Sequence, residues 1–550
     1  MNILSINGTP LTGIYVDAAV SFNKPAKRVS TFSVPGRNGD LVIDEGTFDN
    51  VLISYPVYEK TTFPQEFDSI VNWLASLEGY QKIQCSNDPQ HYRLGRFVVP
   101  VSPTAKRLNK DGYYTLSFDC KPQRWLLSGD EDTEITQNPI DEYSGALISF
   151  NAVALDEITE LKANITAVQS GSGDPSPDNI RLITGWSAAN VYRAGVNLWD
   201  EEWEVGAISD TTGNNTSSTT RARSKNHIPC LPNTTYYFYK SDTPNIRLFY
   251  YNANKGFINA SSAGSANVLI TTPADCYYIR FIGVQSSLDG VNISINYPST
   301  DHNYHAYVGQ TYPISLGQTV YGGTLNVTTG VLTIDRAMVD LGTLTWTYSS
   351  GYFTFSKSTI SAKTGGVYGV ICSAYPYATT GADKTIYETN SYYRIYDSSY
   401  TDAATFKTAM TGVQLVYPLA TPTEVQLTPT EVELLLGQNN IWADTGDVEV
   451  KVTTPTIFNN PSPFNSKPLI RVYGTGDFKV NDITVTITAH DKPYIDIDCE
   501  AQECYYEGEN MASYVTFSGN DFPELVPGNN YMLLASGITK LDVTPRWWIL

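Results

Sequence analysis

The sequence has little charge, few histidines and methionines, and no long hydrophobic run. Charged residues make up 17% of its 550 residues, against about 25% in an ordinary globular domain. No window approaches the roughly 20 consecutive apolar residues that a membrane helix needs. The first residues, MNILSINGTPLTG, lack the basic region and the continuous apolar core of a secretory signal. The sequence therefore predicts neither membrane insertion nor a signal peptide.

The seven cysteines are widely spaced and form no CxxC motif. This spacing favours neither a zinc ribbon nor a thioredoxin-type pair. Cys499 and Cys504 could bridge across a hairpin, but the simpler interpretation is seven buried free thiols in a protein made in a reducing cytosol. The formal net charge of −20 argues against specific nucleic-acid binding, because phosphate neutralisation needs clustered Lys and Arg.

Motifs for catalysis, metals and cofactors are also missing. The sequence contains no G-x-S-x-G, HExxH, P-loop or EF-hand pattern. His302 and His305 would need at least a third ligand, for which Asp301 is the nearest candidate. Asp174 and Asp178 could offer oxygens to calcium, although a solvated turn is the commoner meaning of such a loop. We therefore expect no enzymatic activity, no cofactor and no metal.

Aromatic residues are abundant and tyrosine dominates them. There are 38 Tyr, 20 Phe and 9 Trp, a balance that favours strands over helices. The charge is unevenly distributed, since residues 1–130 hold 13 basic and 13 acidic side chains whereas residues 131–190 hold 2 and 10. This change supports a domain boundary near residue 130.

Residues 1–130 are expected to form strands around one helix. Phe63, Phe67, Ile70 and Leu74 recur at helical steps, which predicts a helix within residues 62–79. The glycine-punctuated segment PGRNGDLVIDEG (35–46) is typical of an extended arm or tight hairpin. Alternating apolar residues predict strands at 51–57, 92–99 and 113–120.

The region from 131 to 455 is predicted to be β-rich, with short strands separated by turns, as in a β-sandwich or jelly roll. The motif Thr428-Pro429-Thr430-Glu431 matches a capping box and predicts a helix that ends at Gly437. A second short helix is expected around residues 402–410. Strands are predicted at 235–240, 246–251, 277–282 and 291–297, and residues 456–550 are expected to form a further sandwich with strands at 468–473, 483–489, 494–499 and 514–517.

Aromatic side chains beside polar ones suggest a glycan-binding site in the middle region. Sugar rings stack their C–H faces on aromatic rings while their hydroxyls bond to polar neighbours. Trp199, Trp203, Tyr250 and Tyr251, with Arg247 beside them, offer that mixture. The competing interpretation is a core role, because neighbouring residues on a strand point to opposite faces and half of each doublet is then buried.

The two ends of the chain resemble the distal tail proteins of long-tailed, non-contractile phages. At the N-terminal end the resemblance rests on the arm at 35–46, FDSIVNWLASLEGYQKI (67–83) and YTLSFDCKPQRWL (114–126). At the C-terminal end it rests on NPSPFNSKPLIRVYGTGD (460–477), YIDID (494–498), FPELVPGNN (522–530) and TPRWW (544–548). The roughly 300 residues between them resemble the insertions of evolved family members, which bind carbohydrates.

The resemblance implies a mainly β fold with a defined order of domains. Residues 1–130 would form an N-terminal ring (belt) domain with one helix, followed at 131–150 by the first part of a galectin-like domain or a linker. The insertion would comprise a carbohydrate-binding-like β-sandwich at 151–300 and a second, β-rich part with a short helix at 301–455. Residues 456–550 would form a C-terminal galectin-like β-sandwich.

The resemblance also implies a structural role at the tip of the virion tail. Six copies would form a ring that joins the tail-tube protein to a tail-associated hub protein, after assembly in the host cytoplasm. The insertion would bind host cell-surface polysaccharide. Two alternatives remain: a stand-alone receptor-binding adhesin or side fibre, and a polysaccharide depolymerase that uses carboxylates among residues 200–204.

Overall fold

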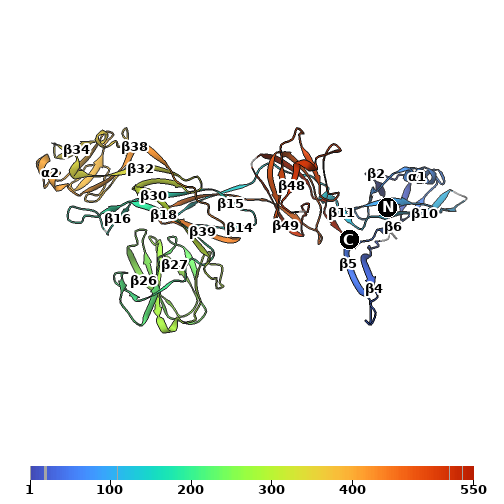
Figure 1. The fold of residues 1–550 in the computed structure, drawn as a ribbon, viewed down its shortest axis with the longest axis horizontal. Coiled ribbons are helices and arrows are strands. Elements are labelled where there is room, and N and C mark those ends of the chain that lie inside the picture. The colour runs from blue at the N-terminus through green and yellow to red at the C-terminus, as the bar shows by residue number, and fades with distance from the viewer. Residues whose placement is uncertain (1, 18–21, 108–109, 172, 520, 536) are drawn as a thin grey trace. The chain divides into compact units, whose positions relative to one another are not determined.

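The computed structural model describes residues 2–17, 22–107, 110–171, 173–519, 521–535 and 537–550. Within these ranges the fold is mainly β, as predicted, with two α-helices among many short strands (Figure 1). The chain divides into two compact units, one formed by residues 1–139 with 455–550 and the other by residues 140–454. The second unit thus interrupts the first along the sequence.

The N-terminal part of the first unit is an antiparallel sheet covered by one helix. Helix α1 (Gln65–Ser76) packs Ile70 and Leu74 into the core. The buried carboxylate of Glu59 accepts hydrogen bonds from the backbone N–H groups of Glu66 (3.3 Å) and Phe67 (2.9 Å). It thereby provides acceptors for two N–H groups of the first helical turn, which have no partner within the helix. The strand order is β2 (Thr9–Pro10), β1 (Leu4–Ile6), β7 (Gln81–Cys85), β8 (His91–Val98), β10 (Asp111–Cys120), β6 (Val51–Glu59) and β3 (Ile14–Val16).

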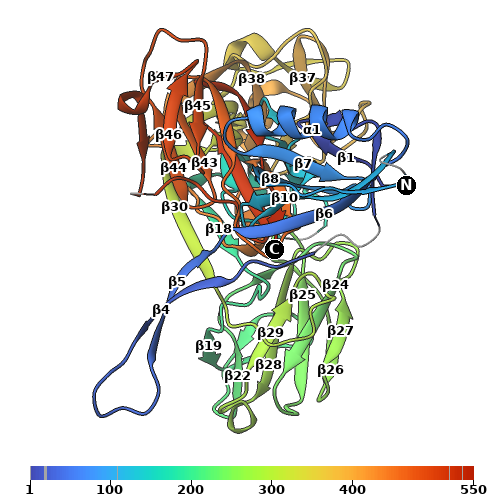
Figure 2. The same ribbon diagram turned by 90° about the vertical axis from the view of Figure 1, so that its right-hand side faces the viewer.

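The segment around residues 35–46 forms the turn and second strand of a two-stranded hairpin, as the glycine pattern predicted. Strands β4 (Lys27–Phe32) and β5 (Leu41–Phe48) pair with each other and project from the N-terminal domain (Figure 2). We call this hairpin, residues 27–48, the arm. Most of its residues are exposed.

The C-terminal part of the first unit is a sandwich of two antiparallel sheets around one apolar core. A strand from before the insertion, β12 (Thr133–Ile135), completes one sheet by pairing with β50 (Ile538–Thr544). That sheet continues through β42 (Leu469–Gly474), β45 (Ile495–Asp498), β46 (Glu503–Tyr506) and β47 (Glu509–Asn510). The other consists of β41 (Thr456–Asn460), β49 (Gly528–Leu534), β43 (Gly476–Val480), β44 (Ile483–Ile487) and β48 (Val515–Phe517).

The first sandwich of the second unit holds one of that unit's three main cores. Its larger sheet runs β13 (Ile140–Gly145), β40 (Val448–Thr453), β15 (Glu157–Thr166), β31 (Gly322–Asn326), β32 (Val331–Asp340), β38 (Gln414–Gln426) and β35 (Ile371–Cys372). The smaller runs β14 (Ile148–Ala152), β39 (Gly437–Ala443), β18 (Trp186–Ala194) and β30 (Gly309–Val320).

A second sandwich and a small third module complete the second unit. The second sandwich pairs the sheet β19 (Trp203–Val205), β22 (Arg221–Ser224), β28 (Tyr278–Val284), β25 (Ile246–Tyr251) and β26 (Phe257–Gly264) with the sheet β27 (Val268–Thr271), β24 (Thr235–Lys240) and β29 (Ile293–Asn296). The third module joins β33 (Thr347–Ser349), β34 (Tyr352–Ser356), β37 (Tyr392–Tyr396) and β36 (Thr385–Glu388) to helix α2 (Ala403–Ala409).

The helix predicted from Thr428 to Gly437 does not form. Residues 427–436 form neither helix nor strand, and Val432 is buried in the core of the first sandwich while Leu436 is 79% exposed. The backbone N–H of Thr430 donates to the carbonyl of Val327 at 2.9 Å instead of closing a helical turn. Packing against the neighbouring strands therefore overrides the local capping signal.

The cysteines agree with the simpler of the two interpretations of the sequence. All seven are free thiols and all are buried. Cys499 and Cys504 lie in and beside the core of the C-terminal sandwich without a disulfide between them. The hairpin bridge considered above is therefore absent from the structure.

Candidate functional site

The five residues predicted to contact glycan all belong to the second sandwich of residues 140–454. Trp199, Tyr250 and Tyr251 are 2%, 5% and 3% exposed, whereas Trp203 and Arg247 are partly accessible. Buried rings present no face to a sugar. These three positions therefore serve the core, and the candidate surface narrows to Trp203 and Arg247.

Trp199 and Trp203 are held by edge-to-face packing. Their ring centroids lie 4.9 Å apart, and each ring also meets Phe281 edge-on, at 4.9 Å for Trp199 and 5.2 Å for Trp203. This geometry is the favourable one for aromatic pairs. The cluster fixes the orientation of Trp203, the member that reaches the surface.

A loop covers the outer face of strand β25, where one ring of the Tyr250–Tyr251 doublet was expected to be accessible to a sugar. Tyr251 Oη donates to the carbonyl of Gly213 at 2.7 Å, and the guanidinium of Arg247 is paired with Asp210 at 2.5 Å. Both partners belong to residues 206–218, which we call the covering loop. Arg247 and Tyr251 thus anchor a part of their own chain.

Two buried arginines strengthen the attachment of the covering loop. Arg223 donates to the carbonyls of Ala207 (2.6 Å) and Thr216 (3.0 Å), and Arg280 donates to Asn215 Oδ1 (2.6 Å). Glu204 accepts from Arg223 Nε at 2.6 Å and from Arg280 at 3.3 Å. The hydrogen bond from Arg223 keeps the pKa of the Glu204 carboxyl below its usual range.

The other carboxylates near the two tryptophans are likewise engaged. Asp200 accepts from Asn226 at 2.6 Å, and Glu202 is paired with Lys225 at 2.7 Å. Glu201 accepts from Tyr304 Oη at 3.0 Å. The carboxyl groups considered for hydrolysis therefore have structural partners.

An open groove lies beside Trp203, at the edge of the five-strand sheet. Its volume is about 750 Å³, and it runs between strand β19 and the turn at residues 285–289. The exposed side chains of Val205 and Val284 form its apolar part. Its polar lining comes from Glu204, Thr219, Thr220, Gln285, Ser286 and Asp289. Small polar residues in turns form no recognisable binding motif. Among the residues that line this groove, only Trp203 and Glu204 were therefore candidates on the basis of the sequence.

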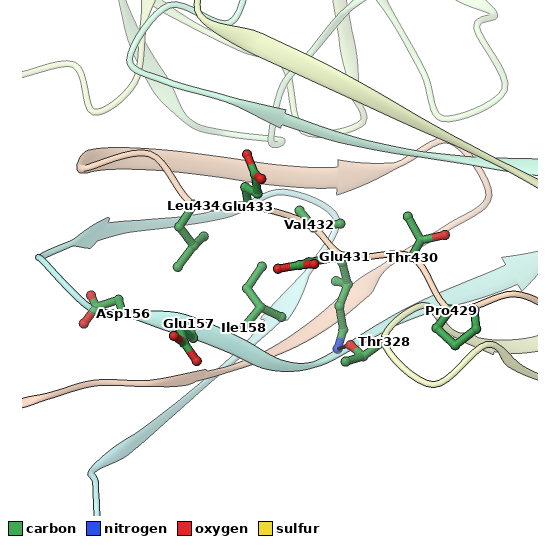
Figure 3. Close-up of a pocket in the computed structure, with 11 residues that line it drawn as sticks. Asp156, Glu157, Ile158, Thr328, Pro429, Thr430, Glu431, Val432, Glu433 and Leu434 are labelled. Atoms are coloured by element: carbon green, nitrogen blue, oxygen red, sulfur yellow. Dashed lines mark hydrogen bonds between the residues drawn. The ribbon is translucent and has the colours of Figure 1, made fainter. Parts of the chain in front are cut away.

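A second groove, of about 540 Å³, lies in the first sandwich (Figure 3). Its walls are residues 156–158 and 429–434, the segment that was predicted to be a helix. Asp156, Glu157, Glu431 and Glu433 make it acidic. Burial raises the pKa of the Asp156 carboxyl, which accepts from the backbone N–H of Val153 at 2.8 Å.

The histidine pair also has local partners. His305 Nε2 lies 2.8 Å from Asp301 Oδ2, and the ring of His302 stacks on Tyr237 with a centroid distance of 4.2 Å. Within the described ranges, no group of three or more His, Cys, Asp or Glu side chains is arranged to hold a metal ion. In the same ranges, no helix is long and apolar enough to cross a membrane.

Comparison with known proteins places the C-terminal end of the chain in a phage family. No curated protein matches the sequence significantly. Among solved structures, the chain aligns with the SPP1 Dit (gp 19.1) protein, described as a hub adsorption apparatus of phages that infect Gram-positive bacteria (10% identity, 52% of this chain, 98% of that chain, TM-score 0.20). It also aligns with a chain of the phage P2 baseplate in its activated conformation with Ca (12% identity, 58% and 96%, TM-score 0.18).

These likenesses are too low in identity and TM-score to identify an assembly or a partner. The family model is more specific: residues 445–547 match the siphovirus-type tail component, C-terminal domain. The matched segment contains most of the C-terminal sandwich, including the motifs at 460–477, 494–498 and 522–530 and all but the last residue of the motif at 544–548. By this match the C-terminal sandwich of the chain is similar to the C-terminal domain of siphovirus-type tail components.

Proposed function

We propose that this chain is a siphophage distal tail protein that forms a hexameric ring at the tail tip, between the tail-tube protein and a tail-associated hub protein. We further propose that residues 140–454 form an inserted module that binds host cell-surface glycan. The observation that carries the structural role is the family match over residues 445–547. The resemblance of the N-terminal motifs to the same family supports the ring.

The arm supports assembly with other copies. Residues directly opposite each other in a hairpin share a face, so Phe32, Leu41 and Ile43 lie on one face of the arm and Val29 and Val42 on the other. All five are exposed. A narrow hairpin with apolar side chains on both faces has no cover of its own, which suits insertion against neighbouring subunits.

The groove beside Trp203 supports glycan binding. It combines one aromatic ring of fixed orientation with apolar side chains from Val205 and Val284 and with hydroxyl, amide and carboxylate groups. That mixture suits the apolar faces and the hydroxyls of a sugar. Six weak sites on one ring would act together, which raises avidity by about 10²–10⁴ over a single site.

Assembly is tested by the mass of the native particle. The 60.7 kDa chain should form a closed six-fold particle in native mass spectrometry and a ring in negative-stain images. A monomer or a trimeric fibre would contradict the ring and favour the stand-alone adhesin.

Glycan binding is tested on an array of bacterial wall polysaccharides. Val205→Asp places a charge on the rim of the groove and should lower binding at least tenfold without changing particle mass. The matched control is Val367→Asp, since Val367 is as exposed as Val205 but lies in the third module. If Val205→Asp and Val367→Asp bind polysaccharide equally well, the groove is not the glycan site. In a separate test, shortening of the polysaccharide chains after incubation with the protein would contradict a non-enzymatic role.

A further inference from the structure

Two cysteine side chains face each other inside the second sandwich. Cys230 directly follows strand β23 (Ile228–Pro229), and Cys276 lies two residues before β28. Their Sγ atoms are 3.6 Å apart, and the two residues are 3% and 0% exposed. The sulfur atoms are thus in van der Waals contact in the interior of the sandwich.

The surrounding backbone is already aligned for a covalent link. Strands β23 and β28 pair through Ile228 with Ile279 and Pro229 with Tyr278. The N–H of Cys230 continues this pairing by donating to the carbonyl of Tyr277 at 2.9 Å. A disulfide needs an S–S distance of about 2.05 Å, so closing it requires the sulfur atoms to approach by roughly 1.5 Å. Side-chain rotation supplies such a movement without changing the strand register.

A small molecule can reach this pair from one side. Cys230 lines a crevice of about 180 Å³ together with Pro229, Tyr277, Tyr278 and other residues of the second unit. Although Cys276 is fully buried, it lies directly behind Cys230. The crevice is large enough for a molecule of the size of water or a peroxide.

The two thiols differ in acidity. The hydrogen bond from Cys230 lowers the pKa of the Cys276 thiol, whereas burial raises the pKa of the Cys230 thiol. The thiolate is the reactive form of either sulfur, and Cys230 is the member of the pair that lines the crevice.

We propose that Cys230 and Cys276 form an oxidation site in which a peroxide closes an intrachain disulfide. One cysteine of the pair loses its proton, and its thiolate attacks one peroxide oxygen and becomes a sulfenic acid, while the released hydroxide takes up a proton to form water. The sulfur of the other cysteine then attacks the sulfenic sulfur, loses its proton and expels a second water. Two thiols and one hydrogen peroxide thereby give one disulfide and two water molecules.

The expected consequence is a more stable insertion after the protein leaves a reducing environment. The bond would close the segment from residue 230 to residue 276, which contains strands β24 to β27, and would restrict it in the unfolded chain. That oxidation would follow release of the virion from the host rests on the proposed function. The reaction of the two thiols with peroxide does not depend on that function.

The test begins with the full chain purified in reductant and then treated with hydrogen peroxide. Peptide mapping without reduction should find Cys230 joined to Cys276 with the loss of two hydrogens, and added thiol should reverse the link. Oxidation should raise the melting temperature of the wild-type insertion. In Cys230→Ser both the link and the rise should be lost, whereas Cys504→Ser should keep both.

Absence of the link in the folded wild-type chain would overturn the proposal, as would a link that appears only after denaturation. If Cys230→Ser does not fold, alkylation of the wild-type chain before and after peroxide decides the question, because oxidation should protect this pair and leave the other five thiols alkylatable after unfolding. Particle mass, measured on the same samples, reports on the ring separately.

Discussion

Placing a charge on the apolar face of the arm should prevent assembly while leaving the subunit folded. The informative change is Val42→Asp, since Val42 is the most exposed apolar side chain of the arm at 58%. It stands opposite Thr31 on strand β4, away from the core of the N-terminal domain. Folding of the subunit does not depend on it.

The size of the effect follows from the exposure of the arm. Full burial of a Val, Leu, Ile or Phe side chain contributes about 1.5–3 kcal/mol, and Val29, Phe32, Leu41, Val42 and Ile43 of the arm retain between 39% and 58% of their exposure. Each can therefore gain about 1 kcal/mol on association. Val42→Asp loses that gain and adds the cost of desolvating an unpaired carboxylate, which is several kcal/mol. A loss of about 3 kcal/mol per interface is roughly a 100-fold weaker contact, repeated at every interface of a closed ring.

The assay is sedimentation or native mass spectrometry over a range of protein concentrations. Wild-type chain should remain assembled at concentrations where Val42→Asp is monomeric, while both show the same thermal unfolding. Val367→Asp, at 56% exposure outside the arm, should assemble normally. If Val42→Asp forms the wild-type particle with unchanged affinity, the arm is not an assembly element and the argument from its exposed side chains fails.

Two further predictions concern the second unit. Lys357 and Glu388 form a fully buried ion pair at 2.6 Å, and Lys357→Met leaves the carboxylate unpaired. This variant should therefore lower the free energy of unfolding by about 3–5 kcal/mol in urea titrations. The control variant Lys363→Met, at an exposed position, should stay within about 0.5 kcal/mol of wild type. Burial against residues that include Tyr251 lowers the pKa of His227 to about 3, so the folded chain leaves this ring neutral while the unfolded chain binds a proton below about pH 6.5. The melting temperature should therefore fall as the pH drops from 6.5 towards 3, and less steeply in His227→Gln; parallel curves would contradict this.

The strands of the fold were predictable because alternation is a local property. The segments 235–240 and 246–251 coincide with β24 and β25, and the helix expected within 62–79 became α1. Strand β24 buries alternate residues and α1 buries Ile70 and Leu74, as the patterns indicated, whereas β25 buries consecutive residues including both Tyr250 and Tyr251. The failure at 428–437 shows the limit of such patterns. A short apolar run there fits a period of 2 as well as 3.6, and the hydrogen bond from Thr430 to residue 327 and the packing of Val432 in the core hold the segment in a non-helical form.

The candidate site was less predictable because its accessibility depends on long-range contacts. The aromatic residues proposed from the sequence as glycan contacts all lie in the second sandwich, but alternation cannot say what covers the outward face of a strand. Here the cover is the chain itself, since Tyr251 bonds to Gly213, 38 residues away, and Arg280 bonds to Asn215, 65 residues away. A strand that presents aromatic rings to a sugar and a strand whose outer face is buried under a loop can have the same local sequence. What distinguishes them is whether a distant loop carries the acceptors that match the polar ends of the strand's side chains. The covering loop supplies these acceptors from the carbonyl of Gly213 and from the side chains of Asp210 and Asn215.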